Sequence, residues 1–123
     1  MMRISDDVAR DIALSDASED YTGLYELIWE FNTQFPEAVE QERLRAAQVA
    51  LGALLRDGLA AVYHTRWLSD QHRELNLSDA ESVIAAPEAW RSPSHQTEGG
   101  YFCFALTDAG EAHYFKRDAP RNS

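Results

Sequence analysis

The stretch from Arg43 to His64 constrains the fold of this chain more than any other segment, because its hydrophobic period changes partway along. Up to Leu55, apolar residues recur at helical spacing and form one stripe. That stripe consists of Leu44, Ala47, Leu51, Leu54 and Leu55. Gly58 then supplies the residue type that commonly ends a helix in the left-handed conformation. From Leu59 to His64 the side chains alternate at the period of a strand. The sequence therefore predicts a helix that leads directly into a strand.

Two further helices are expected before this central helix. Ser5 can cap a short first helix, on which Val8 and Ile12 share one face. Asp20 can cap a second helix, whose apolar side is the most regular pattern in the chain. Pro36 disfavours helical geometry at the preceding residue and suits the first turn of a new helix, so a tight corner should separate the second helix from the central one. The apolar side of the second helix consists of Leu24, Leu27, Ile28, Phe31 and Phe35, widened by Tyr21, Tyr25 and Trp29.

Residues 65–100 form a passage that is too long for a simple turn between two strands, so it should contain structure of its own. The string Ser78-Asp-Ala-Glu81 matches a capping box that opens a short helix, and Pro87 ends that helix. Trp90 is expected to anchor the passage on the body of the protein. Residues 92–100 have the polar composition of a loop.

A second strand is expected from Tyr101 to Leu106, and it should pair antiparallel with the first strand. Thr107 or Asp108 can then cap a terminal helix. Residues 118–123 are expected to fray. These elements predict a single α+β domain that is mainly helical and spans the whole chain.

Two strings in this sequence resemble parts of winged-helix domains. Ala53-Leu-Leu-Arg-Asp-Gly-Leu-Ala-Ala-Val-Tyr63 resembles the passage from recognition helix to wing, and Leu106-Thr-Asp-Ala-Gly110 is similar to the Leu-Thr-x-x-Gly segment after the wing of MarR-like and PadR-like regulators. The resemblance covers about residues 20–117 and is closest to small uncharacterised bacterial winged-helix proteins. It implies a winged helix-turn-helix-like domain, in which a two-stranded wing hairpin carries residues 65–100 as a helical insertion.

The charge of the chain is strongly acidic and unevenly distributed. The full sequence has 11 basic and 21 acidic residues, for a net charge of −10. Residues 1–42 contain eleven acidic residues and two arginines, a net charge of −9, whereas the remainder is nearly balanced. An anionic surface repels phosphate and suits a basic partner, although it is also typical of a solvated face that keeps a protein soluble.

No pattern in the sequence is typical of a catalytic or metal site. The four histidines lack the short spacing of metal ligands. Cys103 would need a neighbouring base to act as a nucleophile, and His64 on the partner strand could supply one; the alternative for this cysteine is a small apolar filler. The sequence contains no phosphate-binding glycine loop, serine elbow or dinucleotide fingerprint. We therefore expect a non-enzymatic protein without a metal or cofactor.

The sequence also bears on location. It has neither a charged-then-apolar leader nor an apolar run of about 18 residues. Its single cysteine cannot form an internal disulfide. We therefore expect a reducing, cytoplasmic environment and no association with a membrane.

Two functions from different classes are consistent with these observations. The first is a protein-binding module, similar to an immunity protein or antitoxin, in which opposite charge speeds encounter with a basic partner. Its candidate contact residues are Asp11, Asp16, Glu19, Asp20, Glu26 and Glu30. The second is a transcriptional regulator that binds DNA as a dimer, for which the acidic start of the central helix is unfavourable. Its candidate DNA contacts are Arg43, Arg45, Arg66 and Arg73. The sequence leaves the oligomeric state open, a homodimer included.

Overall fold

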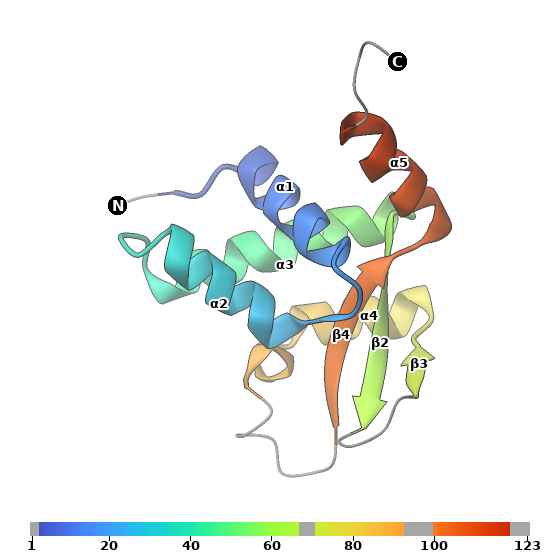
Figure 1. Cartoon of the computed structure of the whole chain (residues 1–123). Coiled ribbons are helices and arrows are strands. Elements are labelled where there is room, and N and C mark those ends of the chain that lie inside the picture. Colours follow the sequence, from blue (N-terminus) through green and yellow to red (C-terminus); the bar gives the residue numbers. More distant parts are fainter. Residues whose placement is uncertain (1–2, 67–70, 93–99, 119–123) are drawn as a thin grey trace.

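The computed structural model describes residues 3–66, 71–92 and 100–118 (Figure 1). In these residues, α-helices are interspersed with the strands of one antiparallel sheet. The expected α+β class with a helical majority is confirmed. In chain order the elements are α1 (Asp6–Ala17), β1 (Thr22–Gly23), α2 (Leu24–Gln34), α3 (Glu40–Arg56), β2 (Ala60–Arg66), β3 (His72–Glu74), α4 (Leu77–Ala85), the 3-10 turn η1 (Pro87–Trp90), β4 (Gly100–Leu106) and α5 (Asp108–Asp118).

The central helix α3 leads into β2 as the change of period predicts. Leu51 and Leu54 are fully buried, and Leu44 and Leu55 pack against the core from partly buried positions. Gly58 follows the helix with a φ of 74°, the left-handed conformation that favours glycine. The predicted stripe and the predicted end of the helix are therefore both confirmed.

The first helix begins where the sequence predicts but buries a different face. Ser5 is its N-cap, since the Ser5 side chain accepts a hydrogen bond from the Val8 amide at 3.5 Å. Val8 itself is 45% exposed, whereas Ile12 packs against the core from a partly buried position, so only Ile12 of the expected apolar face contributes to the core. The buried side of α1 is mostly alanine, and α1 packs against α3, which is also rich in buried alanine. Small side chains on both helices let the two backbones approach closely. Packing of these alanine faces therefore contributes more than burial of the single larger side chain of Val8 would.

The start of α2 and the start of α3 also differ from expectation. Asp20 does not cap α2, because β1 lies between them and Gly23 occupies the cap position. The Glu26 side chain instead accepts a hydrogen bond from the Gly23 amide at 2.9 Å. After the corner at Pro36, α3 begins at Glu40, later than the proline predicts, and the Arg43 guanidinium satisfies a carbonyl group of the corner.

The expected antiparallel pairing of the two main strands is confirmed. β2 and β4 pair along their full lengths, from Ala60 opposite Leu106 to Arg66 opposite Gly100. The strands are longer than expected, so the segment between them covers residues 67–99 rather than 65–100. The expected two-stranded hairpin is also incomplete, because β1 pairs with β4 and β3 pairs with β2, giving the order β1-β4-β2-β3. Neither short strand has a hydrophobic alternation that the sequence could reveal.

The segment between β2 and β4 contains the expected short helix, anchored by the expected tryptophan. α4 begins two residues earlier than the capping box predicts, because the Asn76 side chain accepts a hydrogen bond from the Asp79 amide and Asn76, rather than Ser78, is the N-cap. Trp90 is buried, and its indole Nε1 donates to the Ile84 carbonyl at 2.9 Å. The expected loop at 92–100 lies largely outside the described residues, and its last residue, Gly100, belongs to β4.

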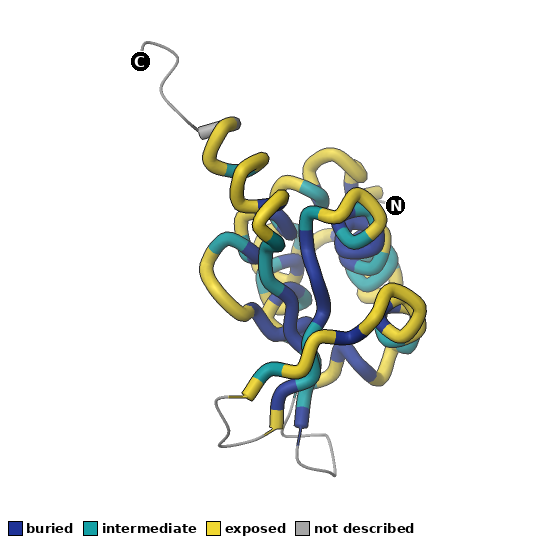
Figure 2. The backbone as a smooth tube through the Cα atoms, turned by 90° about the vertical axis from the view of Figure 1, so that its right-hand side faces the viewer, coloured by how far each residue is buried: buried dark blue, intermediate teal, exposed yellow. Residues whose placement is uncertain are grey.

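The terminal helix α5 follows β4 through a junction that explains the Leu-Thr-x-x-Gly string. Thr107 is the expected cap, since its hydroxyl accepts from the Gly110 amide at 3.0 Å and donates to the Gly58 carbonyl at 2.6 Å. A Cβ atom on Gly110 would lie 1.9 Å from the Leu59 carbonyl oxygen, so no side chain fits there. Residue 118 is helical rather than frayed, and the rest of the expected tail lies outside the described residues. Beyond this junction α5 projects from the body and is mostly exposed (Figure 2).

Candidate functional site

The arginines at the start of α3, two of the candidate DNA contacts, bind the chain's own groups. Arg43 Nη1 donates to the carbonyl oxygens of Ala38 at 2.5 Å and Phe35 at 3.4 Å. Arg45 donates through Nε and Nη2 to the Glu42 carboxylate at 2.8 and 2.6 Å. Both guanidinium groups therefore hold the fold together instead of extending into solvent.

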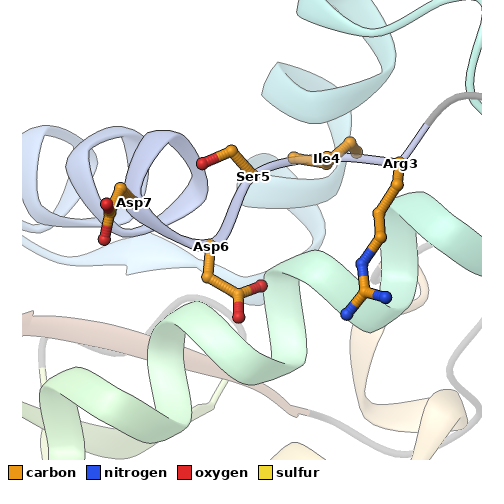
Figure 3. Close-up of a pocket in the computed structure, with 5 residues that line it drawn as sticks. All are labelled: Arg3, Ile4, Ser5, Asp6 and Asp7. Carbon is orange, nitrogen blue, oxygen red and sulfur yellow. The ribbon is translucent and has the colours of Figure 1, made fainter.

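The acidic start of α3 is part of the same internal network. Glu42 also accepts a hydrogen bond from the Ile4 amide at 2.8 Å, and Arg45 reaches the Ile4 carbonyl at 3.2 Å and Asp6 at 3.4 Å. The side-chain hydrogen bonds from Arg45, followed by the one from the Ile4 amide, lower the pKa of Glu42 to about 2. Figure 3 shows Arg3 and Asp6 reaching from the N-terminal segment toward α3, beside a hollow of about 350 Å³. Glu42 and Arg45 thus fasten the start of the chain to α3.

The other two candidate DNA contacts lie elsewhere. Arg66 ends β2 opposite Gly100, and Arg73 lies on β3 opposite His64. The far end of β2 is well separated from the start of α3 (Figure 1). The four arginines therefore do not form one patch.

The structure does bring together four of the six candidate acidic residues. Asp16 and Glu19 lie at the end of α1, and Glu26 and Glu30 lie one helical turn apart on α2; we call these four residues the acidic cluster. Burial, followed by the charges of Glu30, Glu19 and Glu26, raises the pKa of Asp16 to about 7. Asp20 comes directly after the cluster, and Asp11 is exposed earlier on α1. The cluster therefore carries repulsion that a bound cation would relieve.

Replacing Asp16 with asparagine should make stability less dependent on pH between about 5 and 8. The folded chain holds the Asp16 proton up to about pH 7, whereas an unperturbed aspartate releases it near 3.8. The resulting stabilisation is complete below 3.8 and is lost as the pH rises through 7. The parent should therefore be more stable at pH 5 than at pH 8 in urea unfolding, and Asp16→Asn should reduce that difference. Asp11→Asn, on the exposed side of α1, is the matched control; equal slopes in all three proteins would contradict the prediction.

A group of tyrosines, which the sequence analysis did not single out as a site, covers the face of the sheet opposite the core. Tyr63 and Tyr101 project from β2 and β4, and Tyr21 and Tyr25 reach them from the chain around β1; we call these four residues the tyrosine face. The Tyr21 ring is perpendicular to Tyr63 at 5.1 Å and stacks on His72 at 3.8 Å. The alternation of the strands could have identified Tyr63 and Tyr101, but not their two partners.

Cys103 lies under the tyrosine face and does not form the pair that a nucleophile would need. It is buried and only 3.2 Å separates its Sγ from the Thr65 hydroxyl. His64 is adjacent to Phe102 on the other face of the sheet. Burial is the main cause that raises the pKa of the Cys103 thiol. The thiolate is therefore disfavoured.

Neither a metal site nor a membrane-spanning helix is found in the part of the chain that the structure describes. No three His, Cys, Asp or Glu side chains of the described residues are grouped so that they could hold a metal ion. The helices of the described part of the chain are too short or too polar to cross a membrane. Comparisons with protein-family models, with curated proteins and with solved structures returned no match. The function must therefore be argued from the chemistry of the surface itself.

Proposed function

We propose that this protein is a non-enzymatic binding module whose acidic cluster contacts a basic macromolecular partner. The observation that carries this proposal is that Glu19, Glu26 and Glu30 surround the half-buried Asp16, whose pKa is raised to about 7 first by burial and then by these three charges. The charges of Glu30, Glu19 and Glu26 disfavour the ionised form of Asp16 in the free protein, and a partner rich in lysine or arginine would oppose that repulsion. A partner of this kind would resemble the toxin or nuclease that an immunity protein or antitoxin neutralises.

Exposed aromatic side chains on α2 and on the turn before β1 support a contact with protein. Trp29 is 55% exposed on α2, three residues after Glu26, and its ring is perpendicular to that of Tyr25 at 5.0 Å. Tyr21 is 41% exposed. Tryptophan and tyrosine are enriched among the residues that contribute most to protein–protein affinity, and their rings also attract cations. The surface thus combines charge for encounter with apolar area for affinity.

We also propose that the fold is a winged helix, and that its DNA-binding role is absent. The order of α2, α3 and β2, together with β1-β4-β2 as neighbouring strands, supports this fold. A regulator that binds DNA as a dimer is the alternative function. It is less favoured because two of its four candidate DNA contacts, Arg43 and Arg45, are engaged within the chain.

Charge reversal in the cluster tests the proposal directly. A fluorescent peptide of alternating lysine and glycine serves as the probe, with anisotropy measured at about 0.05 and 0.15 M salt. The parent should bind the peptide, more weakly at the higher salt, and Glu26→Lys with Glu30→Lys should weaken binding at least about fivefold. Because Glu26 also accepts from the Gly23 amide at the start of α2, circular dichroism verifies that this double variant is folded. Glu37→Lys with Glu81→Lys makes the same change in net charge at two other exposed positions and is the control.

Two outcomes would overturn the proposed function. An equal loss of peptide binding in the control would mean that only the net charge matters. Micromolar or tighter binding to duplex DNA at about 0.15 M salt, lost when Arg66 and Arg73 become alanine, would favour the regulator instead.

A further inference from the structure

A small pocket next to the acidic cluster is lined by aromatic rings and carboxylates. It lies between the end of α1, the tyrosine face and α5, and its volume is about 170 Å³. Tyr21, Tyr63 and Phe115 are its aromatic lining residues, and both of its charged lining residues, Asp20 and Glu111, are acidic. We call this the aromatic pocket.

The lining of the aromatic pocket matches a cation better than any other group. The face of an aromatic ring carries partial negative charge, so a cation near several rings is attracted by each of them. The Tyr21 and Tyr63 rings are perpendicular with centroids 5.1 Å apart, His72 stacks on one face of Tyr21, and Phe115 comes from α5. Asp20 and Glu111 add full negative charges at the same site. An anion would therefore be repelled, whereas a cation would gain both the ring attraction and the charge of the two carboxylates.

The size of the aromatic pocket limits its occupant to a single chemical group. Pockets for whole cofactors or drug-sized ligands enclose about 300–1,000 Å³, and a cavity of about 150 Å³ holds one benzene ring. At about 170 Å³ this pocket takes the end of one side chain. Phe115 is 60% exposed, so an occupant would also cover apolar surface that water now contacts.

The chain adopts an uncommon backbone conformation to bring an acid to this position. Asp20 has a φ of 88°, and no other non-glycine residue in the described part of the chain has a positive φ. Such a conformation is unfavourable for a residue with a side chain, and residues of this kind concentrate at functional sites. The turn at Asp20 also leads directly to Tyr21, so one turn delivers both a carboxylate and a ring to the pocket.

We propose that the aromatic pocket receives one lysine or arginine side chain of the basic partner, held by the three rings and by the carboxylates of Asp20 and Glu111. This inference rests on the proposed function, because it assigns a specific contact to the same partner on the adjoining surface. A second copy of this chain is a poor occupant, since each copy carries a net charge of −10 and the copies repel one another.

Nuclear magnetic resonance titration with small probes tests the chemistry of the occupant. The probes are the N-acetyl methylamides of lysine, arginine and norleucine, the last being an uncharged analogue of lysine. The two cationic probes should shift the resonances of Tyr21, Tyr63 and Phe115, and norleucine should not. Equal shifts with norleucine would overturn the inference, as would shifts that depend on protein concentration without a probe, because these would indicate an apolar site or self-association.

Pocket variants test whether the partner uses this contact. Phe115→Ala with Asp20→Asn should weaken binding of the lysine-glycine peptide at least about threefold. Leu77→Ala with Glu81→Gln removes one exposed apolar side chain and one carboxylate on α4, away from the pocket, and should weaken binding less. Far-ultraviolet circular dichroism verifies that each variant is folded. If a pocket variant does not fold, Glu111→Gln, at an exposed position of the pocket, is measured in its place. If the pocket variants bind like the parent while the Glu26 and Glu30 reversals weaken binding, the pocket inference fails and the proposed function stands. If no variant matters, both fail.

Discussion

Replacing Leu51 with alanine is expected to lower the free energy of unfolding by about 2–5 kcal/mol. Leu51 is fully buried on the stripe of α3, in the core that the helices share with the sheet. Removing three carbon atoms there loses their burial and leaves a cavity that close-packed neighbours fill only in part. The measurement is urea unfolding followed by circular dichroism, from which the free energy is extrapolated to water.

Val49 provides the matched control for Leu51. It lies on the same helix and is 38% exposed, so Val49→Ala should change the unfolding free energy by less than about 0.5 kcal/mol. A loss for Leu51→Ala as small as that of the control would mean that the buried stripe of α3 contributes little to stability.

Replacing Glu42 with alanine is expected to cost about 1–3 kcal/mol at neutral pH. The Glu42 carboxylate accepts from the Ile4 amide and from two nitrogen atoms of Arg45, and its side chain is only 13% exposed. Its loss leaves the Arg45 guanidinium without its main partner and the Ile4 amide without an acceptor. The start of the chain should then detach from α3, which hydrogen exchange at Ile4 would report.

The same variant has a distinct pH signature. Because the pKa of Glu42 is lowered from 4.5 to about 2, its stabilisation is complete above pH 4.5 and is lost as the pH falls through 2. The parent should therefore lose stability over this range, and Glu42→Ala should lose less. Glu40→Ala, one half-turn earlier and exposed, should follow the parent. If all three proteins lose stability in parallel, Glu42 is not the group that titrates.

The main elements of the fold could be predicted because each has a strong local signal. Gly58 marks the end of α3, and the strand that contains Tyr101 alternates clearly. β1 and β3 could not be predicted, since two or three residues carry no readable period and are strands only because a neighbour offers free hydrogen-bonding groups. The place of Val8 on α1 was predicted wrongly for a related reason. Alanine is only weakly hydrophobic, so the alanine face that α1 buries cannot be recognised until the helix it packs against is known.

The candidate site was predicted in part. Asp16 and its neighbours were selected by charge alone, and the fold was needed to bring α1 and α2 together so that their carboxylates interact. Arg43 and Arg45 look like surface cations in the sequence. Their partners are backbone carbonyls and a carboxylate, and the positions of these groups depend on the tertiary fold. The aromatic pocket joins residues as distant as Tyr21 and Phe115, and no spacing along the chain indicates such a group.

The pairing of β2 with β4 also determines when the functional surface can form. These strands are separated by residues 67–99, so this loop must close before the ladder between them can stabilise the sheet. β1 pairs only with β4 among the described strands and must wait for it, whereas α3 and β2 are consecutive and can form early. The return of β4 is therefore the expected slow step of folding, and Tyr101, Tyr21 and Phe115 take their places only after it. An unfinished chain, or one still being synthesised, would carry the acidic helices without the tyrosine face and without the aromatic pocket.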